Sequence, residues 1–472
     1  MPPRAPLTRP DAAAFHYHSY DYPGDVAAGP FAPSNGLATT SGTQVYSLTQ
    51  DLQGLVAWGN AVNHVPNLAL TRMSTVPGGA LTLDNRETLV LSFGGPLPNS
   101  GLPDVPAVVF TGGIHAREWI AVEIVYLLAE YLIKHYDANP QGNYQPTIKQ
   151  LVDGRRIYCI PMLNPDGNHE TVFAYRLWRK NNRILPQRAA DWVTLLTLNG
   201  ALGIHPPPFR NVLVPAVPAG SPAQYDVPVY DPVAHIPPNV ANNRVTRQLE
   251  IDALGVDLNR NLNTLGWGYD GQHYANDGTP SAGGSYDPLG GTYFGPGPAS
   301  EHETANLQIA LVNAATAPGI AVSIDYHSRG QLILYPTEAF DYGDVGPNYR
   351  RLGQTLRNLV KTGVNPDYQL GIPRTLLHGD ATGTVMDRAA QLHDSQAFTI
   401  ELDPSLAVPN GWLLDEGQIC DVFERNIRGA LAALSAPQHP PQDPVVANQL
   451  YTQIVNRFLG WNVVGRGNRL PA

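Results

Sequence analysis

His115 and Glu118 lie three residues apart in the stretch GGIHAREWI, directly after an apolar segment typical of a buried strand. Imidazole nitrogen and carboxylate oxygen are both zinc ligands, and a catalytic zinc site takes three protein ligands and keeps a further position open. His327, which ends a second apolar segment, is a candidate third ligand. An isolated HxxE pair is more often a surface or capping pair, so the zinc hypothesis depends on residues much further along the chain.

Glu401 is the second unusual residue, because it stands in the otherwise apolar run AFTIEL. Burying an unpaired carboxylate costs free energy, so this side chain must have a partner, be neutral, or face a cleft beside a cation. A general base beside a water activated by zinc meets that requirement. The residue pattern therefore predicts metal-assisted hydrolysis.

These residues lie at the ends of apolar segments that predict buried strands, at 87–93, 107–112, 156–163, 320–327, 331–336 and 397–402. Helical patterns fall between them. One begins with Ser47 and Gln50 spaced like a capping box, and another follows HAREW. This alternation predicts an α/β fold with a mixed, mostly parallel central sheet and helices on both faces. Ligands of such sheets bind where strands end, which is where the candidate residues stand.

Composition limits the classes of partner. The formal net charge is −10 and no basic stripe is present, which argues against a nucleic acid or polyphosphate partner. Two cysteines are too few for a disulfide framework, and Cys159 in RIYCIPML is expected to be a buried thiol. The run AVEIVYLLAEYLI is too short and too acidic to span a membrane, and the N-terminus lacks the apolar stretch of a signal peptide. The compartment is cytoplasmic, or extracellular with a removed leader, and the oligomeric state stays open.

The chain divides into three expected parts. Residues 1–45 form an N-terminal extension, 46–435 the main domain, and 436–472 a proline-rich spacer with a final helix. Two long loops interrupt the main domain, a proline-rich insertion at about 184–254 and a glycine-rich loop at about 266–300. The final helix carries one apolar stripe of Val446, Leu450, Ile454 and Phe458, which is expected to dock on the body, with a contact between subunits as the alternative.

Five segments, in this order, resemble the zinc carboxypeptidases of the carboxypeptidase A and B family. They are GIHAREW, NPDG with RLWRKNNR, GVDLNRN, DYHSRGQLILYP and AFTIEL. The resemblance extends over roughly Tyr46 to Leu434, with the two long loops as insertions. It implies a single carboxypeptidase-like domain that holds one zinc ion per chain and acts on peptides with a free C-terminal carboxylate.

Position by position, the resemblance implies a role for each matching residue. The zinc ligands would be His115, Glu118 and His327, and Glu401 would be the general base. Arg179 would stabilise the oxyanion, Asn259 and Arg260 would bind the terminal carboxylate, and Arg117 and Arg176 would line upstream subsites. A guanidinium binds a carboxylate through two parallel hydrogen bonds, which suits terminal recognition. For any single arginine, the alternative is an ordinary surface salt bridge.

The family pattern fails at several positions. The stretch 375–391 contains no tyrosine to cap the bound carboxylate, and its nearest polar ring is His378. Arg329 stands where the family often has tyrosine, which would change an upstream subsite and could favour acidic substrate residues. Met386 falls at the base of the specificity pocket and favours apolar or aromatic C-terminal residues, unless it is simply part of the core. Two nearby acids could instead attract lysine or arginine, Asp380 and Asp387.

The sequence thus predicts zinc-dependent release of a single C-terminal amino acid from peptides. One alternative is an amidase or endopeptidase that acts on cell-wall peptides or N-acyl amino acids, which the missing tyrosine favours. The Asn259 and Arg260 pair argues against it, because both residues are wasted without a terminal carboxylate. A third possibility is a catalytically silent peptide-binding protein, yet the base and all three ligands are present.

Overall fold

We analysed a computed structural model of the chain. It describes residues 17–20, 24–25, 44–96, 101, 103–137, 145–173, 178–181, 209–213, 226–230, 255–264, 267, 283–284, 291–295, 297–336, 347–360, 368–377, 379, 381–392, 395–404, 412, 416–459 and 461. Among the described residues, no helix combines the length and the apolar character that a membrane span requires.

The centre of the fold is an eight-stranded sheet in the order β12-β11-β13-β10-β6-β7-β5-β4. Its four middle strands, β13, β10, β6 and β7, run parallel to one another, and β11, β5 and β4 pair with their inner neighbours in antiparallel fashion. The strands are β4 Ala69–Arg72, β5 Leu89–Gly94, β6 Ala107–Thr111, β7 Arg156–Ile160, β10 Ile320–Ser328, β11 Leu332–Leu334, β12 Gln369–Gly371 and β13 Gln396–Leu402. The mixed, mostly parallel sheet is confirmed, and all six predicted strands are present.

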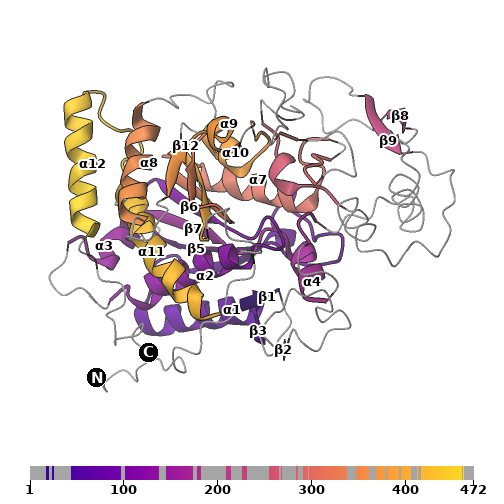
Figure 1. The fold of residues 1–472 in the computed structure, drawn as a ribbon. Coiled ribbons are helices and arrows are strands. Elements are labelled where there is room, and N and C mark those ends of the chain that lie inside the picture. Colours follow the sequence, from indigo (N-terminus) through magenta and orange to yellow (C-terminus); the bar gives the residue numbers. More distant parts are fainter. Residues whose placement is uncertain are drawn as a thin grey trace.

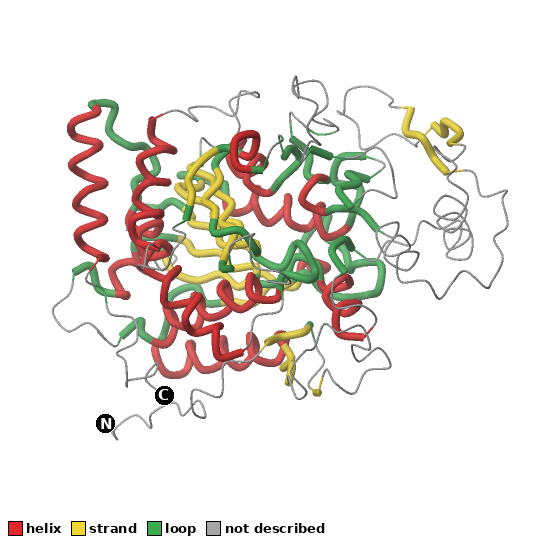
Figure 2. Tube along the Cα trace, viewed as in Figure 1, coloured by secondary structure: helices red, strands yellow, loops and turns green. Residues whose placement is uncertain are grey.

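Helices cover the sheet on both faces (Figures 1 and 2). On one side α2 and α8 pack on the sheet and α11 packs on both of these helices, while α7 and α10 pack on the strands from the other side. The helices are α1 Leu48–Trp58, α2 Trp119–Lys134, α3 Ile148–Asp153, α4 Pro165–Phe173, α7 His302–Ala314, α8 Pro347–Val360, α9 Pro373–Leu376, α10 Val385–Gln391, α11 Glu416–Ser435 and α12 Pro444–Leu459. This layered arrangement buries the middle strands on both faces, which explains their continuous apolar sequences.

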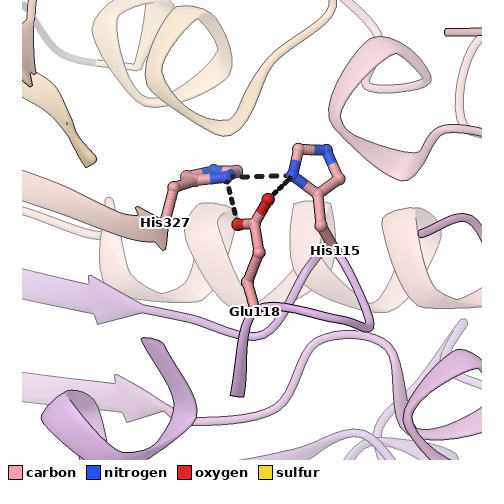
Figure 3. A group of neighbouring side chains, drawn as sticks. All are labelled: His115, Glu118 and His327. Atoms are coloured by element: carbon pink, nitrogen blue, oxygen red, sulfur yellow. Dashed lines mark hydrogen bonds and ion pairs between the residues drawn. The ribbon is translucent and has the colours of Figure 1, made fainter. Parts of the chain in front are cut away.

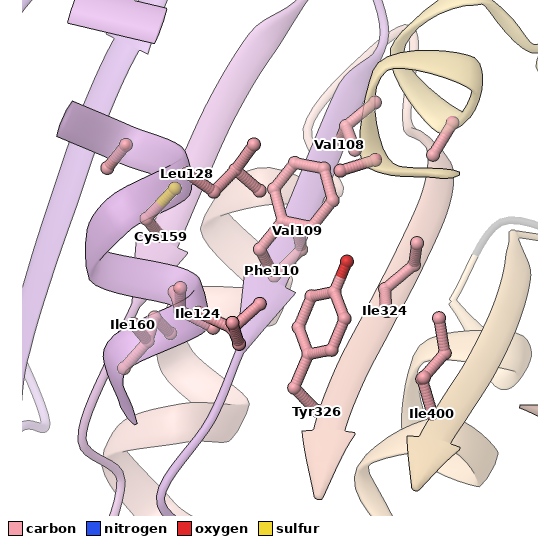
Figure 4. Close-up of a cluster of buried hydrophobic side chains, with 14 of the residues drawn as sticks. Val108, Val109, Phe110, Ile124, Leu128, Cys159, Ile160, Ile324, Tyr326 and Ile400 are labelled. Atoms are coloured by element: carbon pink, nitrogen blue, oxygen red, sulfur yellow. The ribbon is translucent and has the colours of Figure 1, made fainter. Parts of the chain in front are cut away.

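The core lies between α2 and the parallel strands (Figure 4). Phe110 of β6, Ile160 of β7 and Tyr326 of β10 are all at most 1% exposed. Cys159 is a free, fully buried thiol, as expected, and burial raises its pKa. Because α2 is packed between the sheet and α11, the helix is buried along nearly its whole length.

Part of the N-terminal extension also packs on α2. Strand β3 (Gln44–Ser47) lies between β1 (Tyr17–Ser19) and β2 (Gly24–Asp25) and pairs with both. The Tyr17 ring contacts the Trp119 ring edge-on, with their centroids 5.4 Å apart. His18 is buried, and its Nδ1 lies 2.6 Å from the Glu123 carboxylate of α2. This short segment therefore satisfies a carboxylate that α2 buries.

The C-terminal helix α12 docks on the body as predicted, against α8 and α11. The buried stripe differs from the predicted one, because it consists of Ala447, Tyr451, Ile454 and Phe458. Val446 is 48% exposed, so its assignment to the stripe was wrong. The helix is turned about its own axis so that Tyr451 is buried. This orientation is favoured because the Tyr451 hydroxyl hydrogen bonds to Gln396 Oε1 at 3.1 Å. In the proline-rich insertion, the described residues form the antiparallel pair β8 (Phe209–Leu213) and β9 (Asp226–Tyr230).

Glu303, at the start of α7, makes stability depend on pH. Burial, together with the nearby Glu301 and Asp166 carboxylates, raises its pKa to about 8. The folded protein therefore holds this proton between about pH 4.5 and 8, where the unfolded chain releases it, so stability falls as the pH rises through this window. We expect Glu303→Gln to raise the free energy of unfolding at pH 8 by on the order of 1–3 kcal/mol and to change it little at pH 4.5. Thermal denaturation at both pH values checks this, with the partly exposed Glu170→Gln as control.

Candidate metal centre and active site

The three predicted metal ligands come together in the structure (Figure 3). Glu118 Oε1 lies 2.9 Å from His115 Nδ1, and Glu118 Oε2 lies 3.0 Å from His327 Nδ1. The two Nδ1 atoms are 3.1 Å apart, and the ligand atoms of this group all lie within 4.8 Å of one another. Two imidazole nitrogens and a carboxylate that converge in a buried position are a donor set that fits zinc.

The turn between β6 and α2 positions His115 and Glu118. Gly113 starts this turn with a φ of +64°, and a Cβ there would lie 2.7 Å from the Val122 side chain, so only glycine fits. Glu118 N donates to His115 O at 3.1 Å, and Glu118 is the residue immediately before α2, so both ligands belong to one tight turn. His327 arrives from β10, two strand positions after Asp325.

Each histidine is held from behind by a buried aspartate. His115 Nε2 lies 3.1 Å from Asp257 Oδ1, and His327 Nε2 lies 2.7 Å from Asp325 Oδ2. A carboxylate can only accept, so these contacts place the ring proton on Nε2 and leave Nδ1 to face a metal. Asn259 Nδ2 is also 3.1 Å from His327 Nε2, but the shorter contact to the carboxylate decides the tautomer.

The sequence analysis missed both aspartates. Asp325 interrupts the apolar strand IAVSIDYH, as Glu401 interrupts AFTIEL, and it stands two residues before His327 on the same face of the strand. Thr111 of β6 pairs with it across the sheet, and its hydroxyl donates to Asp325 Oδ1 at 2.6 Å. A buried acid two residues before a strand-end histidine was therefore the available signal.

The charged groups of the site shift one another's pKa values. Burial alone would raise the pKa of Glu118, but His115 and His327 outweigh burial and hold it below its usual value. Burial would lower the pKa of His327, but Asp325 and Glu118 raise it well above its usual value. The Glu118 carboxylate thus stays ionised and available to a cation.

Glu401 lies on the same face of the sheet as His327, because the two residues are register partners on the parallel strands β13 and β10. Burial and the nearby Glu118 carboxylate together raise its pKa to about 7, against the opposing effect of His327. A carboxyl group with this pKa takes up and releases a proton near neutral pH, as a general base must.

Two of the predicted arginines, Arg179 and Arg260, lie close to the ligands; Arg260 is buried and Arg179 is partly buried. Arg179 Nη2 is 2.9 Å from Asp257 Oδ2, and its Nη1 is 3.9 Å from Glu118 Oε1. Arg260 Nη1 donates to Asn259 O at 2.7 Å, and Asn259 Oδ1 accepts from Val385 N at 3.0 Å. The segment that carries the predicted carboxylate clamp is thereby fixed to the start of α10 and to His327.

Three of the remaining predicted residues are described by the structure, and each lies in a different environment. Arg117 is half-buried, and its guanidinium lies over the Trp412 ring at 4.1 Å. Met386 is 2% exposed and belongs to the main core, beside the residue that binds Asn259, so a role in side-chain preference stays a prediction. Asp387 is buried and caps α10, with its carboxylate accepting from Thr384 N at 3.3 Å. The positions outside the described residues are Arg176, His378 and Asp380.

Comparison with known proteins gives a consistent picture. Metallocarboxypeptidase A of Trichophyton tonsurans is 25% identical over 397 residues, which cover 83% of this chain and 69% of the relative. Carboxypeptidase B of Rattus norvegicus is 26% identical over 349 residues, 73% of this chain and 61% of the relative. A shorter match, 39% identical over 102 residues and 22% of each chain, is to a Saccharomyces cerevisiae protein named inactive metallocarboxypeptidase ECM14.

The fold agrees with these relatives. The structure of bovine thrombin-activatable fibrinolysis inhibitor, in complex with tick carboxypeptidase inhibitor, superposes with a TM-score of 0.52 at 18% identity. The match covers 87% of this chain and 97% of that one. The model of the zinc carboxypeptidase family matches residues 70–429, a span that holds every described site residue. The chain is therefore a member of the zinc carboxypeptidase family, a family of metallopeptidases, and is a hydrolase.

Proposed function

We propose that this protein hydrolyses the last peptide bond of peptides and releases one C-terminal amino acid, with a preference for apolar or aromatic residues. The main support is the convergence of a His–Glu–His ligand set with Arg179, which lies 3.9 Å from Glu118, and with the half-buried Glu401, the register partner of His327 on the neighbouring strand. Asn259 and Arg260 lie beside the same centre and could bind a terminal carboxylate. Met386 is the residue that favours the apolar preference.

One zinc ion held by His115, Glu118 and His327 would polarise the scissile carbonyl and acidify the attacking water. Glu401 would accept the proton of that water on its carboxylate and deliver it to the leaving amine nitrogen. The Arg179 guanidinium would stabilise the negative charge that develops on the carbonyl oxygen. Arg260, with Asn259, would hold the substrate's terminal carboxylate and so place the last peptide bond at the centre.

Binding of the terminal carboxylate separates this function from an amidase or endopeptidase. A blocked dipeptide with a free C-terminus should be hydrolysed with a kcat/KM about ten- to a hundredfold above that of its C-terminal amide. The physical reason is the loss of the charge-assisted hydrogen bonds to Arg260. The measurement is the initial rate of amino acid or amino acid amide release from the two substrates.

Arg260→Gln provides the matched comparison. This variant should lose most of its activity on the free acid and little of its activity on the amide, which brings the two rates together. Equal hydrolysis of acid and amide by the unmodified protein would instead favour the amidase or endopeptidase alternative. Absence of hydrolysis by the zinc-loaded protein would favour a silent binding protein.

A further inference from the structure

Trp412 lies beneath two guanidinium groups at the edge of the metal centre. The Cζ atom of Arg117 is 4.1 Å from the centroid of the indole ring, and the Cζ atom of Arg329 is 4.7 Å from it. All three residues are partly exposed. The two cations are thus gathered on one aromatic side chain that a ligand can reach.

The group is fixed to the metal-binding residues. Trp412 Nε1 donates to Ser328 O at 3.2 Å, and Ser328 N donates to Glu118 Oε2 at 3.1 Å. Arg117 immediately precedes Glu118, and Arg329 follows Ser328 at the end of β10. Both arginines therefore adjoin, in the chain, a residue that supplies a metal ligand or is hydrogen-bonded to one.

The arrangement suits the recognition of a carboxylate. Stacking on an aromatic ring fixes the plane of a guanidinium but leaves its N–H donors along the edge, where they match the two oxygens of a carboxylate. Two like charges held by one ring also repel each other, and an anion between or beside them relieves that repulsion.

We propose that Arg117, Trp412 and Arg329 form a subsite for an acidic side chain of the substrate, on the N-terminal side of the bond that is cut. This inference rests on the proposed function and adds a substrate class to it. The C-terminal carboxylate has its own candidate site at Asn259 and Arg260, which is anchored to α10. The Trp412 group is anchored instead at the end of β10, so it is available to the preceding residues of the peptide.

The test uses blocked tripeptides with the same C-terminal phenylalanine and either glutamate or glutamine at each of the two preceding positions. Because the two side chains have nearly the same shape, the ratio of the kcat/KM values for the glutamate and glutamine peptides reports the effect of the charge. We expect kcat/KM to be about five- to tenfold higher for glutamate at one of these positions at low ionic strength, mainly through KM, and the ratio to fall with added salt.

Variants locate the preference. Arg329→Gln should bring the glutamate-to-glutamine ratio close to one, Arg329→Lys should retain part of it, and Trp412→Leu should lower it. Arg457→Gln, an exposed substitution on α12, should leave it unchanged. In each variant, hydrolysis of the glutamine peptides should fall less than hydrolysis of the glutamate peptides, so the ratio separates loss of the charge from general damage to the fold.

The result that overturns the proposal is a ratio near one at both positions, or a ratio that Arg329→Gln does not change. Binding of the same tripeptides to zinc-loaded Glu401→Gln protein, measured by calorimetry, gives a readout that needs no hydrolysis. Tighter binding of the glutamate peptide there supports the subsite even if no peptide is cut, whereas a lack of hydrolysis by the zinc-loaded unmodified protein contradicts the proposed function alone.

Discussion

Replacing Glu401 by glutamine should lower kcat/KM for peptide hydrolysis by about 10²- to 10⁴-fold, the usual contribution of a positioned general base. Glutamine keeps the size and the hydrogen-bonding shape of the side chain but cannot accept the proton of the attacking water. Because Glu401 is not among the three ligands, the zinc content should stay the same. Steady-state rates and zinc analysis on the same samples test both statements.

The pH dependence gives a second view of Glu401. A general base acts only when it is deprotonated, so kcat/KM should rise with pH through the pKa of this carboxyl group. Burial and the nearby Glu118 carboxylate together raise that pKa to about 7, and a zinc ion beside it would move it back down. We therefore expect the acid limb of the pH–rate profile between about pH 4.5 and 7, and its disappearance in the residual activity of Glu401→Gln.

A matched control is Glu424→Gln on α11. Glu424 is a partly exposed glutamate and lies 23 residues after Glu401 in the sequence. This variant should retain full activity and the same acid limb. If Glu401→Gln were as active as the unmodified protein, Glu401 could not be the base, and the proposed mechanism would have to be abandoned.

The second large effect concerns Asp325, the aspartate that positions the ring of the candidate ligand His327. Asp325→Asn should weaken zinc binding by about 10- to 100-fold, the usual effect of losing the partner of a metal-bound imidazole. The asparagine fits the space of the aspartate but removes the charge that now lies 2.7 Å from Nε2. Its amide can also turn a donor toward the ring, which would favour the wrong tautomer for a ligand at Nδ1.

Zinc affinity is measured by competition with a chromophoric chelator. Thr111→Val removes the hydroxyl that positions Asp325, and it should give a smaller loss in the same direction. Asp153→Asn, which alters a partly exposed aspartate beside Lys149, serves as control. Equal zinc affinities of Asp325→Asn and the unmodified protein would show that Asp325 does not position the ligand, and melting curves of the metal-free proteins exclude misfolding as the cause.

Much of the site was predictable because its residues stand out from the residues that flank them in the sequence. His115, His327 and Glu401 adjoin apolar runs in which a polar residue is costly, and such runs also predict the strands. The two strands of the central sheet that were not predicted, β4 and β12, are short and partly exposed edge strands. They lack the apolar run that marks a buried strand, since one of their sides faces no neighbour.

By itself, the sequence determined the class of fold, the candidate ligands and the candidate base, because periodicity and burial cost are properties of neighbouring residues in the chain. Only the tertiary structure decided the order of the strands, which places β10 between β6 and β13. That order brings Thr111 against Asp325 and His327 beside Glu401, residues that are far apart in sequence. The pairing of Trp412 with two arginines and the buried face of α12 were decided in the same way, because contacts between distant segments depend on packing that no local pattern encodes.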